Sequence, residues 1–134
     1  MQPKTAAQLV QEAKQRVENL SAERVAAELE QGDALLIDLR EPNEQAQHGM
    51  IPGAISAPRG MLEFWADPTS PYHRQEFDPQ RRIILHCASG GRSALAADTL
   101  QQLGYSNVAH LAGGLQAWAE EGRPITKREP EEQY

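Results

Sequence analysis

The chain has 134 residues, an ordinary length for one domain, and a formal net charge of −6 from 13 basic and 19 acidic residues. This balance argues against a nucleic-acid or anionic-membrane surface, because both need a basic face. A single cysteine excludes a disulfide scaffold and a zinc ribbon. No apolar run is long enough for a membrane span and no secretory segment is visible, so we expect a cytoplasmic protein.

An amphipathic helical extension is predicted at the N-terminus, in residues 1–20. The helix itself is expected over 5–20, where apolar residues recur at helical spacing: Leu9, Ala13, Val17 and Leu20. Other apolar atoms have to cover such a stripe. We therefore expect the helix to dock on the domain's own surface, or on a second copy of the chain to give a homodimer.

The next elements alternate between helix and strand. A helix is predicted over 21–32, because a serine stands at its N-cap position and a glycine at its end. The run 34–39 is apolar and too short for a helix, which is typical of a strand buried on both faces. A short helix begins at Pro42, and the turn 51–55 leads into a second short strand.

Residues 60–78 are predicted to be irregular, with four aromatic side chains between prolines. Strands and helices alternate again after this segment, with strands at 83–86 and 108–111 and helices at 93–103 and 114–121. The pattern predicts a three-layer α/β domain over 21–124, with a mainly parallel sheet and helices on both faces. An acidic tail, 125–134, is predicted to be frayed.

The only cysteine follows the strand 83–86, in the run His86-Cys87-Ala88-Ser89-Gly90-Gly91-Arg92-Ser93. In parallel sheets ligands bind outside the carboxyl ends of the strands, so this is the expected site. The glycines allow a tight loop whose N–H groups turn inward, and these form an anion cradle with the following helix N-terminus. A thiol facing such a cradle ionises readily, and Arg92 adds a positive charge. We expect Cys87 to be a nucleophile, with His86 pointing to the other side of the strand.

Four segments, in this order, resemble the rhodanese domain family and together span residues 21–124. They are 36–44 (LIDLREPNE), 49–54 (GMIPGA), the cysteine loop and 111–118 (LAGGLQAW). The second segment departs from the family pattern at Met50, where the family commonly has histidine. We expect this departure to change local packing rather than activity, and residues 1–20 lie outside the resemblance.

The resemblance implies a single-domain sulfurtransferase. Cys87 would take a sulfane sulfur from a small donor such as thiosulfate, become a persulfide, and pass the sulfur to cyanide or a thiol. The loop that binds substrate and persulfide would consist of Ala88, Ser89, Gly90, Gly91, Arg92 and Ser93. The amides of 88–92 would hold the terminal sulfur, and the two serine hydroxyls could add hydrogen bonds. No cofactor is expected beyond the covalent persulfide, and no histidine shows metal-ligand spacing.

Charged residues after the first two strands are further candidates. Asp38, Arg40 and Glu41 are predicted to form a structural ion-pair and capping cluster. Arg59 is a candidate contact for an anionic donor.

The cysteine loop also resembles the cysteine phosphatase signature, which places five residues between cysteine and arginine. Here there are four, and the shorter loop is the one that the resemblance associates with sulfur transfer. A phosphatase also needs a general acid. Asp38, Asp67 and Asp78 are of the right type, but no spacing marks any of them. A cysteine phosphatase or arsenate reductase, and a non-catalytic binding module, remain the alternatives to sulfur transfer.

Overall fold

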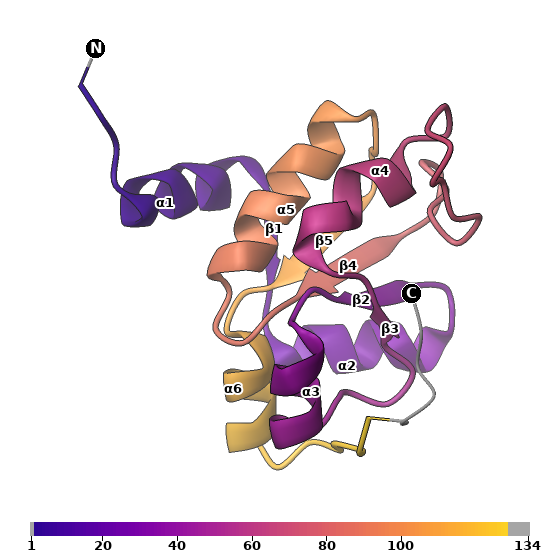
Figure 1. Ribbon diagram of the computed structural model, residues 1–134. Helices are drawn as coiled ribbons and strands as arrows, with labels where there is room; N and C mark the ends of the chain where they lie inside the picture. Colours follow the sequence, from indigo (N-terminus) through magenta and orange to yellow (C-terminus); the bar gives the residue numbers. More distant parts are fainter. Residues whose placement is uncertain (1, 129–134) are drawn as a thin grey trace.

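Five parallel strands form one sheet in the computed structural model, which describes residues 2–128 (Figure 1). The strands are β1 (Glu18–Leu20), β2 (Leu35–Asp38), β3 (Ile55–Ser56), β4 (Ile83–His86) and β5 (Val108–Leu111). Their order is β1-β5-β4-β2-β3, and every neighbouring pair is parallel. The carboxyl ends of all five strands therefore meet at one edge, with β4 in the middle. The predicted α/β class is confirmed.

Helices cover both faces of the sheet, as predicted (Figure 1). One face carries the short 3-10 turn η1 (Arg59–Met61), α4 (Leu62–Ala66) and α5 (Gly91–Gln102), and the other carries α2 (Ala22–Gln31) and α6 (Gly114–Glu120). Alternate residues of each strand enter opposite cores, so that Ile83 and Leu85 pack under α5 while Ile84 packs with Trp118 of α6. The helix α3 (Pro42–His48) follows β2, with its proline in the first turn.

The N-terminal segment differs from the prediction. Helix α1 (Ala6–Arg16) begins at the N-cap Thr5 and ends four residues early, because Val17 takes an extended conformation and residues 18–20 pair with β5. This strand could not be recognised from the sequence, because it is three residues long, buries only Leu20, and Leu20 also fits the helical spacing of the preceding apolar residues. The predicted stripe is consequently split: Ala13 and Val17 are buried on the α5 side of the sheet, Leu20 is buried on the other side, and Leu9 is 45% exposed.

Helix α1 packs against α5 of its own chain (Figure 1). The Arg16 guanidinium donates two hydrogen bonds to the Asp98 carboxylate of α5, at 3.0 and 2.7 Å. Docking on the chain's own surface, the first of the two predicted alternatives, is therefore what covers the buried residues of this helix.

The segment predicted to be irregular contains the five-residue helix α4. Its aromatic residues separate into two groups: Trp65 and Phe77 belong to the core, whereas Phe64 and Tyr72 are exposed and pack edge to face. The burial of Leu62, Trp65 and Ala66 on one side of α4 explains why this short turn is helical.

The predicted tail falls partly outside the described residues, which end at Arg128. Its first residues are not frayed, because Thr126 exchanges two backbone hydrogen bonds with Met50, at 2.7 and 2.8 Å. Met50, the residue that departs from the family pattern, is therefore held by this bridge, and its side chain is buried. None of the helices within residues 2–128 has the length and apolar character that crossing a membrane would require.

Candidate active site

Cys87 lies at the carboxyl end of the central strand β4, and its side chain is 1% exposed. The backbone N–H groups of Gly90 and Ser93 point at its Sγ atom, at 3.2 and 3.4 Å. Helix α5 begins at Gly91, so its positive N-terminal end also faces the sulfur. Of the predicted amide donors, Gly90 contacts the sulfur, and the Ser93 amide is a donor that the sequence analysis did not name. Two N–H donors and the start of a helix therefore converge on Sγ.

Backbone-to-backbone packing holds the loop in place. Gly90 has a φ of 108°, and a Cβ atom there would collide with the Ala112 carbonyl. Gly114 has a φ of 64° and lies equally close to the Ala88 backbone. The first amides of α6 donate to loop carbonyls, Leu115 to Cys87 at 2.9 Å and Gln116 to Ala88 at 3.0 Å. Gly114 therefore lets the segment after β5 pack directly against the cysteine loop.

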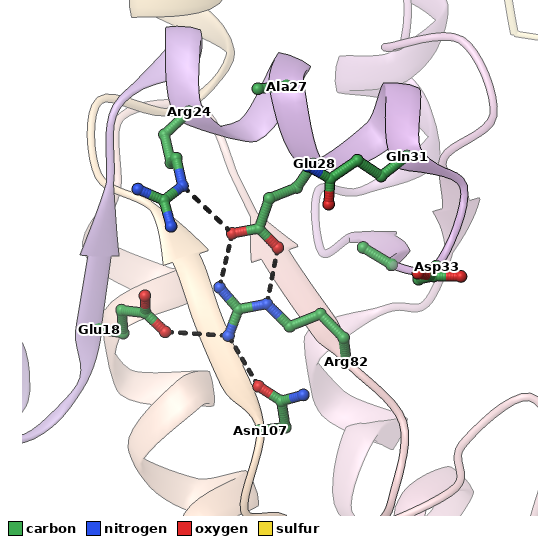
Figure 2. A pocket seen from close by; sticks show the side chains of 9 residues that line it. Glu18, Arg24, Ala27, Glu28, Gln31, Asp33, Arg82 and Asn107 are labelled. Carbon is green, nitrogen blue, oxygen red and sulfur yellow. Dashed lines mark hydrogen bonds and ion pairs between the residues drawn. The ribbon is translucent and has the colours of Figure 1, made fainter.

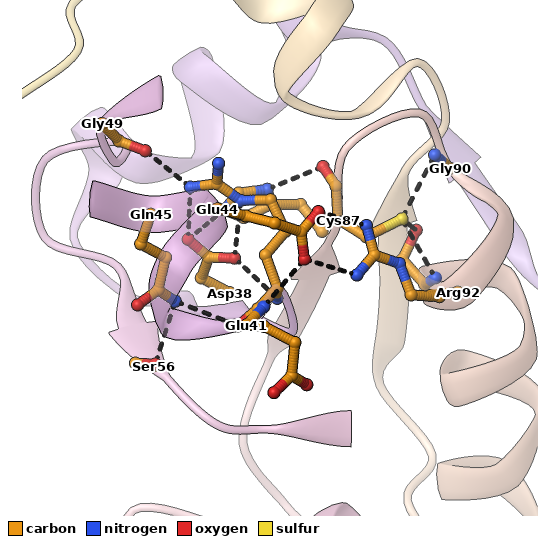
Figure 3. A network of polar contacts seen from close by, with 12 residues as sticks. Asp38, Glu41, Glu44, Gln45, Gly49, Ser56, Cys87, Gly90 and Arg92 are labelled. Atoms are coloured by element: carbon orange, nitrogen blue, oxygen red, sulfur yellow. Dashed lines mark hydrogen bonds and ion pairs between the residues drawn. The ribbon is translucent and has the colours of Figure 1, made fainter. Parts of the chain in front are cut away.

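Arg92 binds Glu44 beside the cysteine loop (Figure 3). Its guanidinium donates two hydrogen bonds to the Glu44 carboxylate, at 2.8 and 2.9 Å. These bonds lower the pKa of Glu44 from 4.5 to about 2, and they are the main cause of the raised pKa of Arg92. Glu44 was not singled out from the sequence, because nothing in its local pattern indicates a partner 48 positions away. The charge that Arg92 brings to the loop is thus shared with a carboxylate.

A second charge cluster lies beneath α3, where the side chains of Asp38 and Arg40 are fully buried (Figure 3). The Arg40 guanidinium donates to both oxygens of Asp38, at 3.1 and 2.8 Å, and to the Gly49 carbonyl at 2.6 Å. His86, also fully buried, contacts the Cys87 carbonyl through Nδ1 at 3.2 Å, and burial lowers its pKa. Asp38 and Arg40 thus form a structural ion pair, and His86 faces this cluster rather than the thiol.

On the side of Cys87 away from His86, three polar side chains are linked by short contacts, namely Ser93, His110 and Asn19. The Ser93 Oγ atom lies 3.6 Å from Cys87 Sγ and 2.8 Å from Nδ1 of His110. Nε2 of His110 lies 2.7 Å from Oδ1 of Asn19. Burial, followed by the charge of Lys14, lowers the pKa of His110 to about 4. His110 and Asn19 could not be assigned to this site from the sequence, since only the pairing of β1 with β5 places them side by side.

Of the remaining predicted site residues, some lie in the cysteine loop and others have no contact with it. Ala88 and Gly91 lie in the loop and at the start of α5, as their sequence positions require. Ser89 is exposed, and the structure gives its hydroxyl no contact with the sulfur within the described residues. Arg59 contacts Glu63 at 3.0 Å and Thr99 at 3.4 Å, and no contact between Arg59 and the loop is found in residues 2–128.

A hollow of about 390 Å³ lies beside the loop, between α3 and α6. Its wall is mainly apolar and is formed by Arg40, Glu44, His48, Ala88, Leu115, Gln116, Ala119 and Ile125. It gives a small molecule an approach to the Ala88 side of the loop.

A larger groove, of about 590 Å³, opens at the opposite edge of the sheet (Figure 2). Its centre is Arg82, which binds Glu28 through two hydrogen bonds of 2.8 Å and Glu18 through one of 2.9 Å. These residues stand at the amino ends of strands or on α2, so the groove lies away from the edge where parallel sheets bind ligands. The charges of Glu18, Arg24, Glu28 and Arg82 already pair with one another, which indicates a structural network.

No group of three or more histidine, cysteine or acidic side chains within residues 2–128 is placed to hold a metal ion.

Comparison with known proteins gives a consistent result. A family model described as the rhodanese-like domain matches residues 21–121. A sulfurtransferase of Allochromatium vinosum is 40% identical over 97 residues, which are 72% of this chain and 82% of that protein. The match covers only 27% of a longer rhodanese-like/PpiC domain-containing protein of Arabidopsis thaliana and 58% of a rhodanese-like domain-containing protein of Mus musculus.

Two solved structures resemble the fold closely. A Rhodopseudomonas palustris protein of unknown function, described as a possible tyrosine phosphatase, is 40% identical with a TM-score of 0.88, covering 93% of this chain and 96% of that one. The homodimeric polysulfide-sulfur transferase of Wolinella succinogenes is 29% identical with a TM-score of 0.73, covering 96% and 90%.

Proposed function

The chain belongs to the rhodanese-like family of sulfurtransferases, and on that premise we propose that it transfers a sulfane sulfur through a persulfide on Cys87. The observation that carries the proposal is the position of the Cys87 sulfur. It faces two backbone N–H donors and the N-terminus of α5. Four loop residues, 88–91, separate Cys87 from Arg92. Such a site favours a sulfur anion over a neutral thiol.

In the first half of the proposed cycle the Cys87 thiolate attacks the outer sulfur of a donor such as thiosulfate. A bond forms between Sγ and that sulfur, and the bond from the outer sulfur to the sulfonate group breaks. Its electron pair leaves with sulfite. The negative charge then lies on the terminal sulfur of the persulfide, for which loop N–H groups are the available donors.

In the second half an acceptor, either cyanide or a thiolate, attacks the terminal sulfur. The bond from Sγ to that sulfur breaks, and its electron pair returns to Cys87. The cycle needs no cofactor, since the persulfide itself carries the sulfur. We place it in a reducing compartment such as the cytoplasm, because Cys87 has to be a free thiol.

A phosphatase is the competing proposal, because the similar Rhodopseudomonas palustris protein of unknown function is described as a possible tyrosine phosphatase. The candidate general acids speak against it. Asp38 is tied to Arg40, and Asp67 and Asp78 accept hydrogen bonds from the turns that follow them. A phosphoryl transfer needs a proton donor at the leaving group, and no contact within residues 2–128 joins any of these three carboxyl groups to Cys87 or Arg92.

Side-by-side assays of the purified protein separate the two functions. We expect it to form thiocyanate from thiosulfate and cyanide, and to leave an activated aryl phosphate unchanged. The Cys87→Ser variant should lose the sulfur transfer and keep its fold. Hydrolysis of the aryl phosphate faster than sulfur transfer would replace our proposal with the phosphatase.

A further inference from the structure

The proton of the Cys87 thiol has a restricted way out of the protein. The thiol is 1% exposed, and its neighbours Gly90 N–H, Ser93 N–H and Arg92 are hydrogen-bond donors that cannot accept a proton. Among the contacts within residues 2–128, the acceptor that the sulfur meets is the Ser93 hydroxyl oxygen, at 3.6 Å. If the thiol loses its proton within the protein, the proton therefore passes to Ser93 and to the group that Ser93 contacts, His110.

The directions of the hydrogen bonds behind Ser93 follow from Asn19. Its side-chain NH2 group donates to the carbonyls of Lys14 and Val17, at 2.9 and 3.0 Å, so its oxygen faces His110. An amide oxygen only accepts, and Nε2 of His110 must therefore carry the proton of a neutral imidazole. Nδ1 is then a bare lone pair, and the Ser93 hydroxyl donates to it. The hydroxyl oxygen is left with lone pairs toward the thiol.

We propose that Ser93 and His110 form a proton relay that ionises Cys87, with Asn19 as the residue that orients the imidazole. The proposal rests on the sulfur-transfer function and deepens it. In the relay step the S–H bond breaks and its proton moves to Ser93 Oγ, while the hydroxyl's own proton moves to Nδ1 of His110. The electron pair of the S–H bond stays on sulfur, and the imidazolium keeps its Nε2–H on Asn19. Thiol and imidazole become thiolate and imidazolium, so charge and protons balance.

The relay also improves the hydrogen bonding of the sulfur. After the transfer, the Ser93 O–H points back at the thiolate, because Nδ1–H now donates to the hydroxyl oxygen. The thiolate then has three donors: the amides of Gly90 and Ser93 and the Ser93 hydroxyl. Activation of a nucleophile by a base that a third group orients is a general strategy of covalent catalysis.

The surroundings of His110 couple its charge to that of Cys87. The charged group that acts directly on His110 is Lys14 of α1, whereas Cys87 lies on the far side of Ser93. Burial and Lys14 both disfavour an imidazolium, whereas the negative sulfur formed in the relay step would attract it. Ser93 touches the sulfur, and His110 and Asn19 act through Ser93.

The relay gives the N-terminal segment a role. Asn19 lies on β1, directly opposite His110 on β5, and it precedes the residues that the family model matches. Its amide group is fixed by carbonyls at the end of α1 and in the connection that follows. The segment that precedes the matched residues thus supplies Asn19, the residue that orients the imidazole of the relay.

The pH dependence of Cys87 alkylation tests the relay without any sulfur transfer. The informative variant is His110→Asn, which keeps an acceptor near the position of Nδ1 but cannot take a proton at neutral pH. We expect its alkylation midpoint to rise by about one pH unit or more, and that of Ser93→Ala to rise similarly. The matched control is His73→Asn, because His73 contacts the Phe77 carbonyl and no contact between His73 and the loop is found in residues 2–128, so its midpoint should equal that of the wild type. Unchanged or lowered midpoints in Ser93→Ala and a folded His110→Asn would overturn the relay.

A spectroscopic comparison keeps the proposal falsifiable if His110→Asn does not fold. Nitrogen NMR of the His110 ring should show the neutral Nε2–H form in Cys87→Ala, which has no thiol proton, and a proton on Nδ1 in the wild type once the thiolate forms. Identical ring spectra in the two proteins would refute the relay. If the alkylation shifts appear but thiosulfate leaves no sulfur on Cys87, the relay stands and the sulfur-transfer function fails.

Discussion

Removing the charge of Glu44 should make Arg92 available to an anionic donor. In the resting protein the Glu44 carboxylate holds the Arg92 guanidinium through two hydrogen bonds, at 2.8 and 2.9 Å. Thiosulfate must compete with this carboxylate to reach the same guanidinium. We therefore expect Glu44→Gln, which keeps the size of the side chain and loses its charge, to bind thiosulfate more tightly.

The magnitude follows from the geometry and exposure of the pair. The pKa of Glu44 falls from 4.5 to about 2, but the Arg92 side chain is 39% exposed and that of Glu44 28%, so water screens part of the interaction. After this discount the pair contributes about 1 kcal/mol. A donor that no longer competes for Arg92 gains a similar amount, which corresponds to a fall in KM of about fivefold.

The assay is steady-state sulfur transfer from thiosulfate to cyanide. The matched control is Asp98→Asn, which removes another carboxylate bound twice by an arginine, but on the α1 side of α5. Its KM for thiosulfate should stay at the wild-type value. A KM that is unchanged or higher in Glu44→Gln would refute the competition between Glu44 and the donor.

The same pair has a signature in the pH dependence of stability. The pKa of Glu44 is lower in the folded protein than in the unfolded chain, so its contribution is fully present above about pH 4.5 and is lost as the pH falls through about 2. The difference in unfolding free energy between wild type and Glu44→Gln should therefore be largest near neutral pH and vanish in strong acid. A difference that grows on acidification would contradict this assignment.

Three further predictions concern the loop and its supports. Gly114→Ala should lower the melting temperature and slow sulfur transfer by about 10²-fold, because its methyl group would displace the Ala88 backbone. Arg40→Met should destabilise the protein by about 3–5 kcal/mol in chemical unfolding, since the buried Asp38 carboxylate loses both guanidinium hydrogen bonds; a loss below 1 kcal/mol would contradict the stabilising role of this ion pair. One glycine inserted between Gly90 and Gly91 should slow sulfur transfer by about 10²–10³-fold, because the amides that face Cys87 are misplaced; retained transfer would contradict the argument from loop length.

The parts of the site that could be predicted from the sequence are those that lie together in the chain. Cys87, the two glycines and Arg92 follow one another, so strand, tight loop and helix start could be placed from local rules alone. The central strands could also be predicted, because a short apolar run such as 83–85 is typical of a strand that is buried on both faces.

Contacts between distant segments could not be predicted in this way. Glu44 and Arg92 meet because α3 follows β2 and α5 follows β4, and these strands are neighbours in the sheet. Asn19 reaches His110 only through β1, and the helical spacing of the apolar residues before it concealed that strand. Arg59 is the reverse case: its position after β3 suggested an anion contact, and the structure places it on Glu63.

The most direct test of the sulfur-transfer account is the intact mass of the protein after incubation with thiosulfate and removal of the excess donor. The account predicts a gain of one sulfur atom in the wild type, no gain in Cys87→Ser, and loss of the added mass when cyanide is supplied, with thiocyanate released in equal amount. An unchanged mass in the wild type, or the same gain in Cys87→Ser, would contradict the central claim that Cys87 carries the sulfur.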